Sequence, residues 1–428
     1  MIKQTNKFKT KHFIFPVLWF ILTLLQTGLV FAQFNGNFDI EKHYLLEENS
    51  LDWKASQPSK TWLYDWYNSQ SGMVISVGSL SQEHFYSESE TRLTAEFGDY
   101  FAIMYSRNEE SFVRKNPAYQ ETEFRFGGLV AASIIGFPEH DKKYNNIGAA
   151  ITLGKRWTWN YLRLSFLDQF FEYDDKNDND DKNSVTDKYI TTPEMHRMEI
   201  QTFIGERLFF KIDFGQEHET VFRVCSKRQP ACLSDELTNE TKTYHGFDYR
   251  GTLDLIFPDS WLFGVSGRKD FEKRDILPDL KSDSLPDLSQ NLELQIREVY
   301  LYIWVTNDDQ LSFGYLEQYF SNEINSSIEL KKYEHTTKAH LYWIKQETRT
   351  SEVFQWTFEV IAGNVYLYKD NRAEDEIKNE TTDQGKFKLG MTMISGDRAK
   401  LLLTSTFDLD YSERRAWDGG GVQFQIVF

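Results

Sequence analysis

The sequence predicts an antiparallel up-and-down β-barrel of about 18 strands that crosses a membrane, and three patterns support this. Polar and apolar residues alternate from Gly72 onward, short and long connections follow one another in turn, and tryptophans gather beside the short connections. Successive side chains of a strand point to opposite faces of its sheet, so alternation gives each strand one apolar and one polar face. A closed sheet with lipid outside and a polar interior accounts for all three patterns.

Alternation is clearest near the C-terminus. Apolar residues take every second position from Phe354 to Val360 and from Phe387 to Met393, with polar residues or glycine between them. Similar ladders run over residues 198–204, 210–214, 247–255, 261–267 and 399–409. Soluble β-sandwiches show the same period, so alternation alone does not distinguish them from a membrane barrel.

The connections between strands favour the barrel. Short turns are expected at about 98–99, 127–128, 154–156, 205–207, 258–260, 306–309, 347–351 and 396–398. Longer polar connections fall between them, at about 82–90, 108–119, 138–146, 173–194, 220–243, 270–290, 323–333, 369–384 and 412–418. This series gives 18 strands with both ends of the barrel on the short-turn side, or 16 strands without the weakly marked turn at Gly127. Transmembrane barrels sort their connections by side in this way, and a soluble sandwich has no reason to do so.

Tryptophans provide an independent indication of the membrane. Tryptophan and tyrosine concentrate where their amphipathic rings meet lipid headgroups. Four tryptophans lie close to short turns and share a parity with apolar neighbours, so they are predicted to form an aromatic girdle at the periplasmic interface: Trp261, Trp304, Trp343 and Trp356.

Residues 1–32 have the composition of a secretory signal peptide. Lysines precede an apolar stretch from Phe13 to Leu25, and Ala32 places a small residue where a signal peptidase could cut before Gln33. The alternative is an uncleaved anchor helix, because residues 13–32 are just long enough to span a bilayer. The barrel itself is expected to occupy residues 72–428.

Residues 33–71 precede the first predicted strand and are rich in aromatic side chains. They include Trp53, Trp62, Tyr64, Trp66 and Tyr67, which argues against a passive tail. Three interpretations stay open: a plug inside the barrel, a docking segment for a periplasmic partner, and a short helix on the barrel mouth.

The last strand carries a recognisable pattern. Apolar residues alternate with glutamines up to a terminal phenylalanine, at Val422, Phe424, Ile426 and Phe428. This resembles the C-terminal assembly signal of Gram-negative outer-membrane β-barrels of the porin-like superfamily, with Ile426 in place of a common aromatic residue. The resemblance covers residues 72–428 as an architecture and identifies no specific family. It implies the bacterial outer membrane as location, and membrane lipid, lipopolysaccharide and the barrel-assembly machinery as partners.

The polar parity of the predicted strands supplies the candidate pore lining. At 16 to 18 strands a barrel is too wide for side chains alone to fill, so a water-filled channel is expected unless something plugs it. The candidates are the ionisable residues of this parity: Arg92, Glu96, Glu123, Arg125, Arg163, Arg197, Glu199, Lys211, Asp213, Arg250, Arg268, Lys338, Glu359, Lys386, Lys388 and Lys400. Facing basic and acidic ladders would orient polar solutes; the alternative is that these charges neutralise one another.

Composition and motifs exclude several other functions. The formal charge of −17 argues against nucleic acid as a partner, because phosphate binding needs a basic face. No motif typical of a hydrolase, a metal site or a cofactor is present, so no enzyme activity and no cofactor are expected. The two cysteines, Cys225 and Cys232, lie in a polar stretch and are a candidate local disulfide of an exported protein.

Two functions remain after these exclusions. The first is a porin-like channel for the diffusion of small polar or charged solutes. The second is a barrel that acts as the scaffold or sheath of a trans-envelope complex, such as an electron conduit or a polymer exporter. The chain carries no haem-attachment motif, so a conduit would need separate cytochromes.

Overall fold

The described part of the chain is a single antiparallel sheet. The computed structural model describes residues 71–427 apart from 81–83, 98–99, 113, 116–118, 128, 137–146, 156–159, 169–170, 176–186, 192–193, 206, 227–239, 258–259, 279–287, 307, 327–331, 373–375, 397–398 and 410–415. These residues form 21 strand segments, and none of them is helical. Within the described ranges, then, no helix is long and apolar enough to cross a membrane.

The sheet closes on itself. β1 (Gly72–Leu80) pairs antiparallel with β21 (Trp417–Val427), from Gly72 opposite Val427 to Leu80 opposite Gly419. Three segments extend neighbouring strands instead of adding to the ring, namely β4 (Arg114–Lys115), β9 (Phe171–Asp175) and β10 (Asp187–Thr191). The other 18 strands form the wall, which confirms the predicted number. Between β1 and β21 these are β2 (His84–Phe97), β3 (Phe101–Phe112), β5 (Tyr119–Phe126), β6 (Val130–Gly136), β7 (Ile147–Lys155), β8 (Asn160–Asp168), β11 (Glu194–Ile204), β12 (Leu208–Ser226), β13 (Glu240–Phe257), β14 (Trp261–Pro278), β15 (Leu288–Trp304), β16 (Asp309–Ser326), β17 (Tyr333–Arg349), β18 (Phe354–Asn371), β19 (Glu376–Ser395) and β20 (Ala399–Asp408).

The turns lie where the sequence predicts them. Eight short turns sit at one end of the barrel, the short-turn end, and both Gly72 and Val427 lie there. The least marked of them, at Gly127, is a tight turn in which this glycine has a φ of 59°, a left-handed conformation that glycine adopts at little cost. The structure therefore has the 18-strand arrangement and excludes the alternative of 16.

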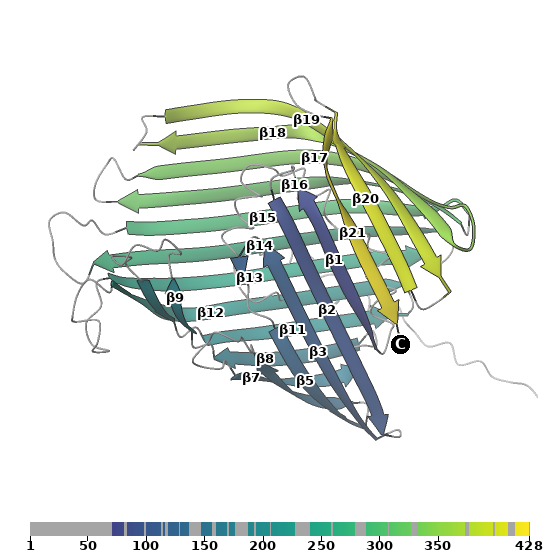
Figure 1. The fold of residues 1–428 in the computed structure, drawn as a ribbon, viewed down its shortest axis with the longest axis horizontal. Coiled ribbons are helices and arrows are strands. Elements are labelled where there is room, and N and C mark those ends of the chain that lie inside the picture. The colour runs from purple at the N-terminus through teal and green to yellow at the C-terminus, as the bar shows by residue number, and fades with distance from the viewer. Residues whose placement is uncertain are drawn as a thin grey trace, which may run out of the picture.

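One side of the barrel is much taller than the other. Strands β12–β19 are 17 to 20 residues long, whereas about 9 to 11 residues cross a bilayer. Their extra length lies away from the short-turn end, and we call these eight strands the long wall (Figure 1). Several predicted long connections are therefore wrong in extent: only residues 81–83 separate β1 from β2, and only 372–375 separate β18 from β19. Strands can stay paired beyond the lipid because backbone hydrogen bonds between strands do not require a lipid environment.

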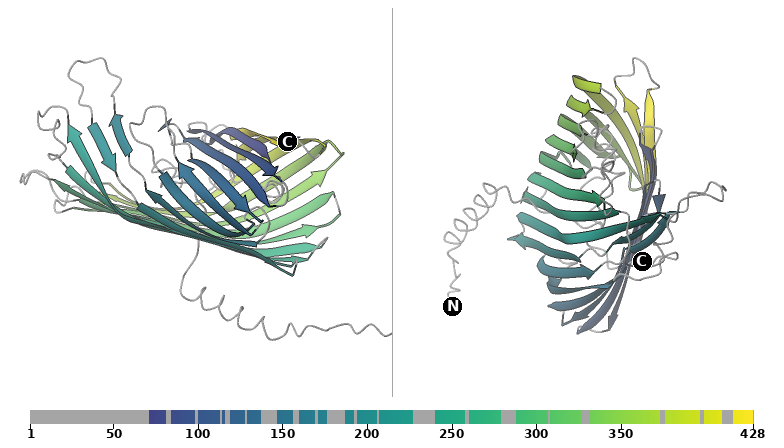
Figure 2. Two further views of the ribbon diagram at one scale, coloured as in Figure 1. Left: turned by 90° about the horizontal axis from the view of Figure 1, so that it is seen from below. Right: turned by 90° about the vertical axis from the view of Figure 1, so that its left-hand side faces the viewer.

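The barrel is flattened in cross-section. Figure 2 shows the long wall on one side and β20, β21 and β1–β3 on the other, with the chain passing around both edges. In Figure 1 the second group crosses in front of the long wall at a steep angle. The interior faces of the two groups therefore look toward each other.

Large apolar side chains cover the exterior around the whole ring. Isolated exposed apolar residues are normal on soluble proteins, but a continuous band of them indicates contact with lipid. Tyr342 on β17 is 62% exposed, and the band includes Ile75, Leu93, Phe97, Phe126, Ile134, Ile151, Leu164, Phe166, Ile204, Leu255, Phe263, Val299, Phe313, Ile344, Phe358, Val360 and Val422.

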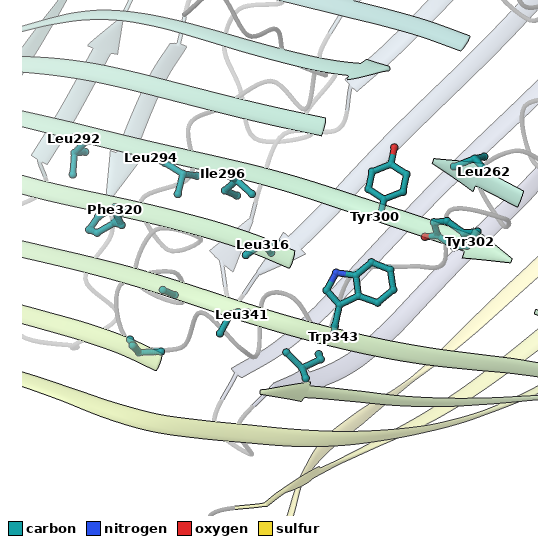
Figure 3. Packing of buried hydrophobic residues seen from close by; sticks show 13 residues of the cluster. Leu262, Leu292, Leu294, Ile296, Tyr300, Tyr302, Leu316, Phe320, Leu341 and Trp343 are labelled. Carbon is teal, nitrogen blue, oxygen red and sulfur yellow. The ribbon is translucent and has the colours of Figure 1, made fainter. Parts of the chain in front are cut away.

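The interior face of the long wall carries a second apolar surface, which we call the interior strip. Its side chains come from β14–β18 and lie on the face opposite to the exterior band (Figure 3). Each is at most 7% exposed: Leu262, Leu292, Leu294, Ile296, Tyr300, Tyr302, Leu316, Phe320, Ala339, Leu341, Trp343, Ile361 and Val365. Apolar residues therefore occupy both faces of this part of the wall.

Glycines make room for the large rings of the interior strip. Gly264 lies between Asp254 and Tyr300 on adjacent strands, and its missing side chain lets the Tyr300 hydroxyl donate to the Asp254 carboxylate. Gly314 has the same relation to Trp343: a Cβ at this position would lie 2.6 Å from the indole ring. The indole N–H reaches across Gly314 and donates to Glu298 at 3.0 Å. Rings packed over glycines help to fix which face of these strands points toward the interior.

Three predicted placements are wrong. Trp343 and Trp304 face the interior, Trp343 within the interior strip and Trp304 packed against it, so neither belongs to a girdle. Lys338, a predicted pore residue, lies on the exposed exterior of β17. In β17 both faces are apolar around residues 341–344, and the exterior face becomes polar farther from the short-turn end. Alternation alone therefore did not show which face points inward, and the prediction reversed the two. Trp261 and Trp356 do lie on the exterior parity.

Replacing Gly314 with alanine should destabilise the barrel. The new Cβ would overlap the Trp343 indole and displace it from Glu298, and overpacking of this kind costs about 1–3 kcal/mol. The temperature at which the folded band is lost in heat-modifiability gels should fall. Gly385→Ala is the control, since its Cβ would make only a 3.3 Å contact with the Leu409 side chain. Equal transitions for both variants would contradict this packing.

Candidate functional site

Ionisable residues gather on the interior face of β5–β14, which we call the charged wall. A continuous row of cross-strand partners runs over β8, β11, β12, β13 and β14 through Arg163, Glu199, Asp213, Arg250 and Arg268. Cross-strand partners share a face of the sheet, so alternation within each strand is enough to bring these five side chains into line.

Arg163 joins two carboxylates from different strands. Its guanidinium lies 2.6 Å from Glu121 Oε1 and 3.4 Å from Glu199 Oε1, and the Tyr161 hydroxyl donates to Glu199 at 3.2 Å. Arg163 and Glu121 are each 1% exposed. A buried ion of either sign is costly unless it is paired and hydrogen-bonded, and this arrangement supplies both.

Small residues allow this pairing to extend across two intervening strands. Glu121 is on β5 and Arg163 on β8, with β6 and β7 between them. Apart from Ile135, the buried interior positions of those two strands hold small side chains: Ala131, Ser133, Ala150 and Thr152. The long arginine side chain therefore lies along the wall and reaches Glu121.

Arg197 forms a second junction of the same kind. Its guanidinium lies 2.8 Å from Asp213 Oδ1 and 3.1 Å from Asp248 Oδ2. Gly215 stands between Arg197 and Asp248 in the strand register, and a Cβ there would lie 2.2 Å from the Asp248 carboxylate and 2.8 Å from the guanidinium. Glycine at this position leaves the space in which the two charges meet.

The charged wall ends abruptly at β15. In the register, Arg268 on β14 is opposite Ile296, and Asp270 is opposite Leu294. Arg268 pairs with Asp270, and at the other end of the wall Arg125 pairs with Glu123 at 2.7 Å. Beyond β14 the same interior rows continue as the interior strip. The interior thus changes from a charged surface on β14 to an apolar one on β15.

The charges are arranged as pairs and not as separate ladders. On β17–β21, Lys345 lies 3.3 Å from Glu347, Lys388 lies 3.7 Å from Glu359, and Lys386 contacts Asp418. In the charged wall, Arg125, Arg163, Arg197 and Arg268 likewise contact carboxylates on their own or other strands. Of the two interpretations open for the pore lining, the described residues favour mutual neutralisation.

Fifteen of the predicted pore residues lie on the interior face, and Lys338 is the exception. These are Arg92, Glu96, Glu123, Arg125, Arg163, Arg197, Glu199, Lys211, Asp213, Arg250, Arg268, Glu359, Lys386, Lys388 and Lys400.

Sequence reasoning missed several interior acids, among them Glu121, Asp270 and Glu272. Glu121 shares the parity of Glu123 and Arg125, and that parity could have identified it. Asp270 and Glu272 were assigned to a connection, whereas β14 continues through both. Recognising that strand pairing extends past the membrane would have included them.

Other predicted sites are less complete in the structure. Val422, Phe424 and Ile426 lie on the exterior parity of β21, while Phe428 lies outside the described residues. The proposed disulfide also falls outside them, because Cys232 and the side chain of Cys225 are not described. In the described ranges no three histidine, cysteine or acidic side chains are grouped closely enough to hold a metal ion.

Closure of the sheet, the lipid-facing band and the charged interior together decide the class of protein. The fold is that of bacterial outer-membrane β-barrels. Such a fold can span a membrane, because closed strands leave no unpaired backbone edge in lipid. No protein-family model matches the chain, and no curated protein matches it.

Several solved outer-membrane proteins are similar to the chain at low identity and low TM-score. A bacterial polysaccharide outer-membrane secretin is 10% identical, with a TM-score of 0.38 over 84% of this chain and 99% of its own. OccK11 (OpdR) of Pseudomonas aeruginosa is 8% identical, with a TM-score of 0.36 over 84% and 95%. The translocator domain of the autotransporter NalP from Neisseria meningitidis is 10% identical, with a TM-score of 0.30 over 63% and 89%. No function follows from similarity at this level.

Replacing Arg163 with methionine should destabilise the barrel strongly. It would leave Glu121 and Glu199 as buried charges without their cation, and breaking such a buried pair costs about 3–5 kcal/mol. Urea unfolding in detergent micelles, followed by tryptophan fluorescence, measures the loss. Leu164→Ala, a lipid-facing change on the same strand, should have a much smaller effect.

The double variant Arg163→Met with Glu121→Gln separates charge from packing. Removing one of the stranded carboxylates should restore part of the lost stability. If the double variant is less stable than Arg163→Met alone, the ion pair does not explain the effect.

Proposed function

We propose that the chain is a non-enzymatic outer-membrane channel for small polar or charged solutes. The charged wall is the observation that supports this most directly. Ionisable groups inside a membrane-spanning segment are expensive and usually mark a path for polar molecules. A barrel with only a structural role would not need these charges, because its strands could pair and close equally well around an apolar interior.

The exterior of the long wall supports a contact with charged lipid headgroups. Lys338 lies 5.8 Å from the centre of the Tyr319 ring and 6.0 Å from that of Tyr366, on the strands to either side. Beside it, the Tyr315 hydroxyl and His340 Nδ1 lie 2.7 Å apart. Tyrosines with a basic residue among them are typical of the membrane–water interface, where lipopolysaccharide phosphates would lie.

The interior strip favours a second candidate, a barrel that surrounds a protein segment. An apolar surface inside the lumen gives no advantage to a diffusing polar solute, whereas it would pack against apolar side chains from another segment. A sheath or scaffold within a trans-envelope complex would use such a surface. Planar-bilayer recordings separate the two functions. Stable conductance from the purified protein supports the channel, whereas a silent barrel that copurifies with other envelope proteins supports the sheath.

Ion selectivity should respond to the charged wall. Asp248 is the more exposed carboxylate of the Arg197 junction, with 26% of its side chain accessible. Asp248→Asn should shift the reversal potential in a salt gradient toward anions, because Arg197 would then have one counter-charge fewer. A lumenal charge acting through water is worth roughly 1 kcal/mol, or up to about five-fold in the permeability ratio.

The matched control for this measurement is Lys338→Gln. It removes one charge of comparable size from the exterior of β17, where no permeating ion would pass. Selectivity should stay unchanged in this variant. Lys338→Gln changes the net charge in the direction opposite to Asp248→Asn, so a shift of equal size and opposite sign in this variant would show that the reversal potential reports total charge and not the charged wall.

A further inference from the structure

The interior strip is an apolar face that the described strands alone do not explain. Its side chains line one wall of a lumen whose other wall carries paired charges, and they are almost fully shielded from water. It begins near the short-turn end, at Leu262 and Tyr302, and runs along β15 to Leu292. Ten residues of strand correspond to about 33 Å, so the strip extends far into the barrel.

The segment that precedes β1 has the composition to pack against this strip. Residues 33–70 lie outside the described part of the chain, and their five aromatic residues between Trp53 and Tyr67 are the densest such group there. The long undescribed stretches between strands, such as the acidic 176–186, lie at the opposite end and are strongly polar. Aromatic side chains would bury the most apolar area on an apolar wall.

The start of β1 places this segment at the mouth of the barrel. Ser71 lies at the short-turn end, where its Oγ accepts a hydrogen bond from the backbone N–H of Thr94 at 2.9 Å. The chain before Ser71 therefore leaves the wall beside the lumen opening. Thirty-eight residues could extend to roughly 125 Å, several times the length of the strip.

We infer that residues 33–70 enter the lumen from the short-turn end and pack their aromatic side chains on the interior strip, so that the chain plugs its own channel. The plug rests on the proposed channel function, since it names what regulates conductance through the same lumen. Its apolar side faces β14–β18, and its polar residues face the charged wall. This gives each lumenal surface a partner of matching chemistry.

Photocrosslinking of the full-length protein in its native membrane tests the docking directly. A photoreactive phenylalanine analogue in place of Trp62 or Trp66 should crosslink to peptides of β15–β17 that contain strip residues such as Leu316 or Leu341. The same analogue at Ile344, on the exterior of β17, should crosslink to lipid. Crosslinks from Trp62 and Trp66 to another envelope protein, or to no part of the interior strip, would overturn the proposal.

Conductance tests the consequence of docking. Deleting residues 33–68 while keeping the signal peptide should raise mean conductance in planar bilayers several-fold over the full chain. A full-length variant with Trp53, Trp62 and Trp66 all changed to serine should rise similarly, because it keeps the length of the segment and loses its apolar contacts. Equal conductance in all three proteins would overturn the plug and leave the channel intact.

The two assays together separate the two proposals. Crosslinks to the strip in a barrel that stays silent after deletion would support the docking and contradict the channel. A conducting deletion variant whose parent shows no strip crosslinks would support the channel and contradict the docking.

Discussion

The structure depends on the completion of one hydrogen-bond ladder. Every backbone N–H and C=O group in lipid needs a partner within the protein, and an open sheet would leave two unpaired edges in the hydrocarbon. Nine residue pairs between β1 and β21 remove those edges. Because the ladder closes, the exterior is free to be apolar and the interior is free to carry charge.

The strand register then decides which side chains meet inside. Large and charged groups lie opposite glycine or small residues: Tyr300 beside Gly264, Trp343 beside Gly314, and Arg163 across the small side chains of β6 and β7. The space left by each glycine or small residue lets a side chain reach past the neighbouring strand to a carboxylate. The interior is thus organised by the spacing of small residues as much as by the positions of the charges.

Much of the fold could be predicted because it depends on a period of two and on turn residues. The strand number, the weakly marked turn at Gly127 and the shared position of both barrel ends follow from these local signals. The faces of β15 and β17 could not be predicted in the same way. Trp343 and Lys338 have opposite parities, and either assignment satisfies alternation, since the strand is apolar on both faces near Ile344.

The candidate site shows the same division between local and long-range information. Alternation placed most of the interior charges correctly. It gave no indication that Arg163 would pair with Glu121 three strands away, because that contact depends on curvature and on the size of residues between them. The interior strip was missed altogether, since apolar residues were expected to face lipid.

The unequal height of the wall affects how molecules reach the lumen from outside. The strands of the long wall extend farther from the short-turn end than β1–β3, β20 and β21 do (Figure 1). The described strands therefore reach different heights at the end away from the short turns, high over β12–β19 and low over β1–β3, β20 and β21. A molecule that approaches along the membrane surface would meet the long wall on one side and only short described strands on the other.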